Sequence, residues 1–163
     1  AATRASLLKL IHLLVIADGR LTAPEFLLYT ILKRRLGTEA GRAVPVRFQS
    51  VKELPRETAL LLSLVAAVRL PERAEHAFNA GALLLPGDPS LVTAGEIRLD
   101  EVSAALDRLN QLAPLAKPLL IRAATAVAFV DGETKWRAAS TLRMICAALD
   151  VPLPPQVLAT EGE

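Results

Sequence analysis

Two Asp-Gly pairs, each followed by a further acid, are the residues of this chain whose types and spacing best suit ion binding. Asp18 is followed by Glu25, and Asp131 is followed by Glu133. Carboxylate oxygens are the ligands that Ca²⁺ and Mg²⁺ take in proteins, but calcium needs about six to eight of them. Helix capping accounts for the same residues without an ion, because Asp and Glu accept turn and cap hydrogen bonds and Gly adopts positive φ. We favour capping and keep a divalent-cation site at these four acids as the alternative.

A narrow polar stripe is the second feature that could carry function. Ser6, Lys9 and His12 recur at a spacing of three along a stretch that is otherwise apolar, so they share one helix face. Arg122 and Thr125 repeat the pattern later in the chain. Such a stripe is either a functional surface or the solvated edge of a mostly buried helix, and we favour the edge.

Positive charge is concentrated in one place but is small overall. The formal net charge is +2, and aromatic residues make up 4% of the chain, so a nucleic-acid surface with stacking side chains is not expected. The local cluster could meet anionic lipid headgroups, although cations at a helix C-terminus also complement the helix dipole. Its members are Lys33, Arg34, Arg35, Arg42 and Arg47.

Catalytic motifs do not stand out. A zinc-peptidase helix needs two His four residues apart with a Glu beside the first, whereas His12 and His76 stand in no such setting. The stretch from Gly37 to Gly41 lacks the Gly-Lys-Ser/Thr ending of a phosphate-binding loop. Cys146 lies in an apolar run and is expected to be a small buried hydrophobe. We therefore expect this segment not to be an enzyme and to hold no cofactor other than the alternative Ca²⁺ or Mg²⁺.

The elements that must position these residues are all helical. Apolar periodicity, Gly and Pro predict about seven helices, and the apolar run from Ala59 to Val68 is expected to be core and not a membrane span. Pro152, Pro154 and Pro155 are expected to end the helical part, leaving a frayed tail. The predicted helices cover about 5–17, 22–37, 55–70, 71–83, 98–112, 115–130 and 135–149.

An internal repeat organises these helices. Shifting the sequence by 113 residues places Asp18-Gly19 on Asp131-Gly132, Leu32 on Ile145 and Leu36 on Leu149. Each unit is a very apolar helix, an Asp-Gly turn and an amphipathic helix, and neither hairpin can cover its own apolar helix. We therefore expect one domain over 1–163, with repeat 1 at about 5–37, middle helices at about 51–112 to close the core, repeat 2 at about 115–150 and a tail at 151–163.

The residues from Ile16 to Glu25, which read Ile-Ala-Asp-Gly-Arg-Leu-Thr-Ala-Pro-Glu, resemble the repeats of TerB-like (tellurite-resistance type) helical domains. The second half is similar to the C-terminal region of bacterial HtpX-like membrane zinc metalloproteases, the proteases with chaperone function. The residues that carry this resemblance are Leu106, Asp107, Leu109, Leu112, Pro114, Lys117, Asp131 to Thr134 and Ala147 to Pro154.

The resemblance departs from the family pattern at two positions of the second repeat. Ala138 stands where the first repeat has Glu25, and Trp136 occupies the first turn, where a small polar residue is usual. Any function that needs both acids is thereby weakened at the second turn. The resemblance implies a zinc peptidase as parent, with its zinc helix outside this segment.

Three hypotheses follow. The first is an interaction or regulatory domain that forms the accessory region of such a protease. Its partner would be another protein or the parent's own protease domain. It would lie in the cytoplasm, tethered at the inner membrane, with Lys33, Arg34 and Arg35 toward an anionic membrane surface. The second is a cation-binding TerB-like module acting on its own. The third, a stand-alone helical enzyme, has no acid/base pair or nucleophile to support it.

Overall fold

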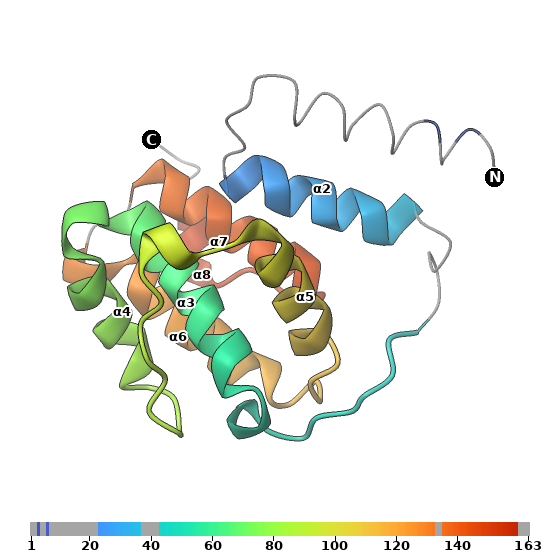
Figure 1. The fold of residues 1–163 in the computed structure, drawn as a ribbon, viewed down its shortest axis with the longest axis horizontal. Coiled ribbons are helices and arrows are strands. Elements are labelled where there is room, and N and C mark those ends of the chain that lie inside the picture. Colours follow the sequence, from blue (N-terminus) through green and yellow to red (C-terminus); the bar gives the residue numbers. More distant parts are fainter. Residues whose placement is uncertain (1–2, 4–5, 7–22, 37–42, 133–134, 160–163) are drawn as a thin grey trace.

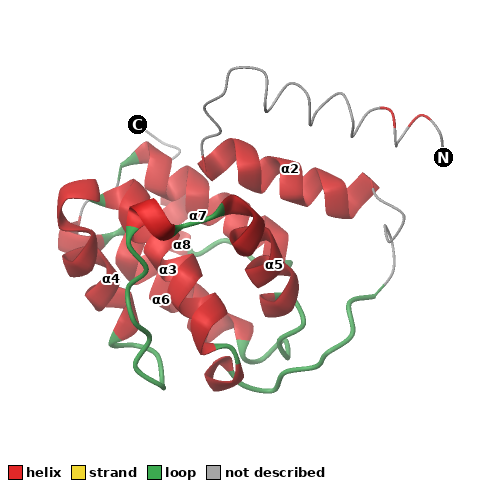
Figure 2. Ribbon diagram, in the orientation of Figure 1, coloured by secondary structure: helices red, strands yellow, loops and turns green. Residues whose placement is uncertain are grey.

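The computed structural model describes residues 3, 6, 23–36, 43–132 and 135–159. Within these ranges the chain is all-α, as the sequence predicts, and its one β-type pairing is an isolated bridge between Phe48 and Leu112 (Figures 1 and 2). The α-helices are α2 (Ala23–Leu36), α3 (Pro55–Arg69), α4 (Ala74–Ala82), α5 (Leu99–Leu109), α6 (Lys117–Ala128), α7 (Trp136–Leu149) and α8 (Pro155–Ala159). Short 3₁₀ turns lie at Val51–Glu53 (η1), Pro71–Arg73 (η2), Ala94–Glu96 (η3) and Val130–Gly132 (η4).

Six of the predicted helices lie within a few residues of their expected bounds. The helix predicted to start at Pro71 begins as the 3₁₀ turn η2 before it becomes α4. The predicted helix at 5–17 and the Asp18-Gly19 turn lie outside the described residues. The second half of the first hairpin is present as α2.

The central element is α3, because it is buried all round. Every residue from Thr58 to Ala66 is buried, and Ala67 and Val68 are half-buried, so the run predicted as core from Ala59 to Val68 is confirmed except at its last two residues. α3 packs against α4, α5, α6 and α7. Its buried hydroxyl at Ser63 donates to the carbonyl of Ala59 at 2.7 Å and accepts from the amide of Val92 at 2.9 Å, so this buried polar group is satisfied.

The equivalent second helices of the two repeats, α2 and α7, pack on each other (Figure 1). Leu27 of α2 and Leu142 of α7 are both fully buried. At the surface, Arg35 Nη2 donates to Asp150 Oδ1 at 2.7 Å and links the end of α2 to the residue that follows α7. The two elements that the repeat relates are therefore direct neighbours.

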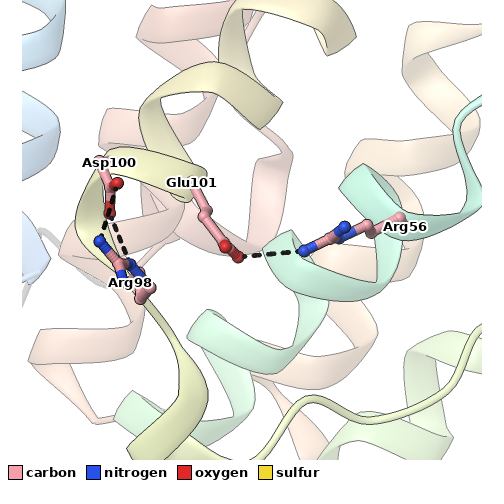
Figure 3. Close-up of polar contacts among 4 residues, drawn as sticks. All are labelled: Arg56, Arg98, Asp100 and Glu101. Atoms are coloured by element: carbon pink, nitrogen blue, oxygen red, sulfur yellow. Dashed lines mark hydrogen bonds and ion pairs between the residues drawn. The ribbon is translucent and has the colours of Figure 1, made fainter.

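Helix α5 is joined to α3 by ion pairs as well as by apolar packing. Arg108 Nε lies 2.8 Å from Glu57 Oε1, and Arg108 also stacks 5.3 Å from the ring centre of Phe48. At the other end, Arg56 Nη2 lies 3.5 Å from Glu101 Oε2 (Figure 3). The Arg56–Glu101 pair is exposed and contributes little, whereas Glu57 is mostly buried, so the Arg108 pair and the apolar contact hold α5 in place.

The start of α5 carries a local ion pair. Arg98 contacts both carboxylate oxygens of Asp100, at 3.2 and 3.3 Å (Figure 3). This hydrogen bonding lowers the pKa of Asp100 and raises that of Arg98. The pair is exposed and fixes the local geometry without adding much to stability.

The expectation that the chain frays after its prolines is wrong for residues 155–159. These residues form α8, and Val157 is fully buried. Arg143 of α7 donates to the Val157 carbonyl at 3.1 Å. Pro155 stands in the first turn of α8, where a missing N–H costs nothing, so the prolines end α7 and start a further helix.

Helices α4 and α6 approach each other closely at Gly81. A β-carbon at this position would lie 2.5 Å from the Ala123 carbonyl oxygen and 2.5 Å from Val127 Cγ2. The first of these atoms belongs to backbone and has little room to move. Glycine is therefore required here by the packing of α4 on α6.

We expect Gly81→Ala to destabilise the fold by about 1–3 kcal/mol, because the added methyl forces α4 and α6 apart. Gly95→Ala is the matched control, since a β-carbon at Gly95 would meet nothing within 4 Å. Urea unfolding of both variants measures the difference. Equal stabilities for the two variants would contradict the close helix contact.

Candidate functional site

The second Asp-Gly turn is a compact left-handed turn. Asp131 has φ 64° and ψ 19°, and Gly132 follows with φ 78°. The Gly132 amide donates to the Phe129 carbonyl at 3.0 Å. Positive φ is expected at the glycine, but the structure also places Asp131 there, a conformation that Asp tolerates better than most residues.

Three basic side chains, His76, Arg73 and Arg69, lie near Asp131. His76 Nε2 of α4 lies 3.0 Å from Asp131 Oδ1. Buried Arg69 donates to the carbonyls of Ala128 and Val130, both at 3.1 Å, and so binds the end of α6 directly. The pKa of Asp131 is lowered by the hydrogen bond from His76, with the charges of His76, Arg73 and Arg69 acting in the same direction.

The basic side chains near Asp131 make a divalent-cation site at this turn less favourable. A carboxylate that already accepts from His76, close to two guanidinium groups, gives a divalent cation an unfavourable setting. No cluster of three or more His, Cys, Asp or Glu side chains that could hold a metal occurs among the described residues. Glu25 belongs to the first turn of α2, but its side chain, Asp18 and Glu133 all lie outside what the structure describes.

The predicted basic surface is only partly described. Arg35 is engaged by Asp150, so its charge is shared with a carboxylate. Arg47 is exposed, whereas Arg42 and the side chains of Lys33 and Arg34 lie outside the described residues. None of the helices in the described ranges is long and apolar enough to cross a bilayer.

Cys146 is fully buried in α7, as expected. Burial raises the pKa of its thiol to about 11. The nucleophilic thiolate is therefore scarce at neutral pH, and the side chain acts as a core hydrophobe.

A groove of about 570 Å³ beside α6 offers room for a ligand. We call it the α6 groove. Its floor is one face of α6, its wall is the segment 151–156, which runs into the first turn of α8, and Leu84 lies at its edge. The floor residues are Pro118, Ile121, Arg122, Thr125, Ala126 and Phe129.

The polar stripe of the second repeat faces this groove. Arg122 and Thr125, predicted to share a helix face, both line it. The Thr125 hydroxyl donates back to the Ile121 carbonyl at 2.7 Å, while Arg122 is exposed. Their counterparts Lys9 and His12 lie outside the described residues.

Both sides of the groove are fixed by the fold. After α7 the chain turns at Asp150, with φ 53°, and the Val151 amide donates to the Cys146 carbonyl at 3.0 Å. Buried Val157 and its bond from Arg143 anchor the far end of the wall.

Lys117, at the start of α6, strengthens the same region. Its ammonium donates to the Leu149 carbonyl at 2.9 Å and to Asn110 Oδ1 at 2.8 Å. One side chain thus ties the start of α6 to the ends of α5 and α7, which fixes the helix that forms the floor of the groove.

The groove suits an apolar ligand that carries one anionic group. Arg122 is the one charged side chain among its lining residues in the described chain, and most of the others are apolar. Ligand sites of this kind are mostly apolar with a few polar groups that set orientation. The sequence places Arg122 and Thr125 on one helix face, for which a solvated edge was the favoured interpretation. It did not predict the wall, although apolar Val151 and Leu153 alternate there with Pro152 and Pro154.

Comparisons of this chain with protein-family models, with curated proteins and with solved structures found no match.

Calcium at about millimolar concentration, a range in which weak protein sites fill, is expected to leave the thermal midpoint unchanged. The reason is the cationic surroundings of Asp131. Differential scanning calorimetry with calcium and with a chelator measures the effect. A midpoint that rises with calcium concentration would support the cation-binding hypothesis.

Asp131→Asn is expected to flatten the acid side of the stability profile. The folded-state pKa of Asp131 is lowered, so its contribution is present above the unfolded pKa near 3.8 and is lost as pH falls through the folded value. Asn tolerates left-handed φ, so the substitution removes the charge without straining the turn. Urea unfolding from about pH 7 to pH 2 measures the slope.

Asp88→Asn is the matched control for this experiment, because Asp88 also has a left-handed φ, of 49°, and lies outside the Asp131 cluster. Parallel profiles for wild type and Asp131→Asn would show that the His76 contact does not stabilise the fold.

Proposed function

We propose that this chain is a non-catalytic interaction and regulatory domain, and that it is the accessory region of a membrane-anchored zinc metalloprotease of the HtpX-like type. The observation that carries the proposal is the α6 groove, a preformed apolar surface on a well-packed scaffold. In this proposal the domain lies on the cytoplasmic side of the inner membrane and is held there by its parent.

The groove supports interaction because its shape is already set. A ligand loses less free energy on binding a fixed surface than on ordering a loose one. The volume of about 570 Å³ lies in the range of about 300–1,000 Å³ that is typical of ligand sites. The wall is anchored by Val157 and Arg143, and the floor belongs to a helix in contact with α3, α4 and α7.

The residues that carry the family resemblance also support the accessory-region part of the proposal. Leu106, Leu109 and Leu112 are buried, and Lys117 holds α6 to α7. Val151 to Pro154 belong to the groove wall. If the resemblance reflects descent, the same residues build the scaffold and the groove in the related proteins.

The first test is the coding sequence upstream of Ala1. We expect it to encode a His-Glu-x-x-His helix flanked by membrane spans, since that helix places two imidazoles on one face for zinc. A start codon directly before Ala1 would contradict the accessory-region proposal and leave a free-standing TerB-like protein.

The second test uses the full-length enzyme with the groove filled by Ala126→Trp. If the groove recruits protein substrates, kcat/KM for a protein substrate should fall about tenfold or more, while that for a short peptide stays unchanged. Zinc content and the thermal midpoint serve as controls for folding. Equal effects on both substrates, or none on either, would contradict a recruiting role.

A further inference from the structure

Exposed apolar side chains continue from the edge of the α6 groove toward the end of α4. Leu83 is 86% exposed and the adjacent Leu84, at the groove edge, is 43% exposed. They follow directly on α4, so the apolar surface continues from the end of α4 into the groove. Contiguous apolar surface of this kind marks sites where another molecule binds.

The wall of the groove favours a ligand that satisfies its own backbone. Pro152, Pro154 and Pro155 carry no N–H, so the wall cannot act as the edge strand of a sheet. The Thr125 hydroxyl is already bonded to Ile121. An extended peptide would leave buried backbone groups unpaired, whereas a helix pairs them internally.

The length of the floor fits a helix as well. Pro118, Arg122 and Ala126 follow one another at a spacing of four, and Phe129 completes the row. From Pro118 to Phe129 a helix rises about 16 Å, which is about three turns. A second helix lying along this floor would present about three or four apolar side chains to it, at positions i, i+3, i+4 and i+7.

Charge decides which helix fits. Arg122 is the one cation lining the groove in the described chain, and no lining residue is acidic. A partner that brought a Lys or Arg to this point would meet repulsion, whereas an Asp or Glu would pair with the guanidinium in a bidentate way.

We infer that the α6 groove binds an amphipathic helix of a partner protein, with its apolar face on α6 and a carboxylate on Arg122. This inference rests on the proposed interaction function and names the partner's chemistry.

A display library of random peptides of about 16 residues, selected on the immobilised chain, tests the inference. We expect enrichment of sequences with apolar residues at helical spacing and an Asp or Glu beside them. Against Arg122→Glu, a selected peptide should lose about tenfold or more in affinity. The same peptide with its acid changed to Lys should recover binding to that variant.

Two further variants control the experiment. Ala126→Trp fills the groove without touching its charge and should abolish binding. Arg47→Glu makes the same charge reversal at an exposed residue outside the groove and should leave binding unchanged. Thermal midpoints of all variants establish whether each is folded. If Ala126→Trp does not fold, the Arg122→Glu variant and its Lys peptide still decide the question.

Several results would overturn the inference. They are the absence of enrichment, enrichment of proline-rich or basic peptides, indifference to the Arg122 exchange, and self-association of the chain through the groove. If the full-length enzyme still loses protein turnover with Ala126→Trp while the library shows no helical acidic motif, the helix inference fails and the interaction function stands.

Discussion

The burial of α3 on all sides is the constraint on which the rest of the structure depends. A helix whose residues from Thr58 to Ala66 are all buried must be covered all round, and α4, α5, α6 and α7 supply that cover. Covering α3 also determines which surfaces remain. Helix α6 gives one face to α3, another to α4 and a third to α7, so one strip of it is left toward solvent, and that strip is the floor of the α6 groove.

The ends of the helices are held by a few long side chains. Arg69 binds two carbonyls at the end of α6, Lys117 binds the last carbonyl of α7, and Arg143 binds the carbonyl of Val157 in α8. Each satisfies backbone oxygens that a helix end leaves unpaired. Cations placed there also complement the helix dipole, so Arg69, Lys117 and Arg143 stabilise the fold.

Much of the fold could be predicted from the sequence, because apolar periodicity and Pro and Gly positions fix helices locally. The core run in α3, the burial of Cys146 and the starts of α3 and α7 follow from such signals. The helix α8 could not, since its stability comes from Val157 packing against distant residues. The basic neighbours of Asp131 could not be predicted either, because Arg69 and His76 are far from it in the sequence.

The candidate site shows the same division between local and long-range information. Arg122 and Thr125 were identified by their spacing, which is a local property of one helix. The apolar wall opposite them forms only because the chain turns back at Asp150 and is anchored by α8. Without this wall, Arg122 and Thr125 would form a solvated edge of α6. With it, they form the polar part of the groove. What a polar residue on a helix does is thus decided by the segment that packs beside it. Here half of that segment, 151–156, is proline, which cannot donate a backbone hydrogen bond to a strand.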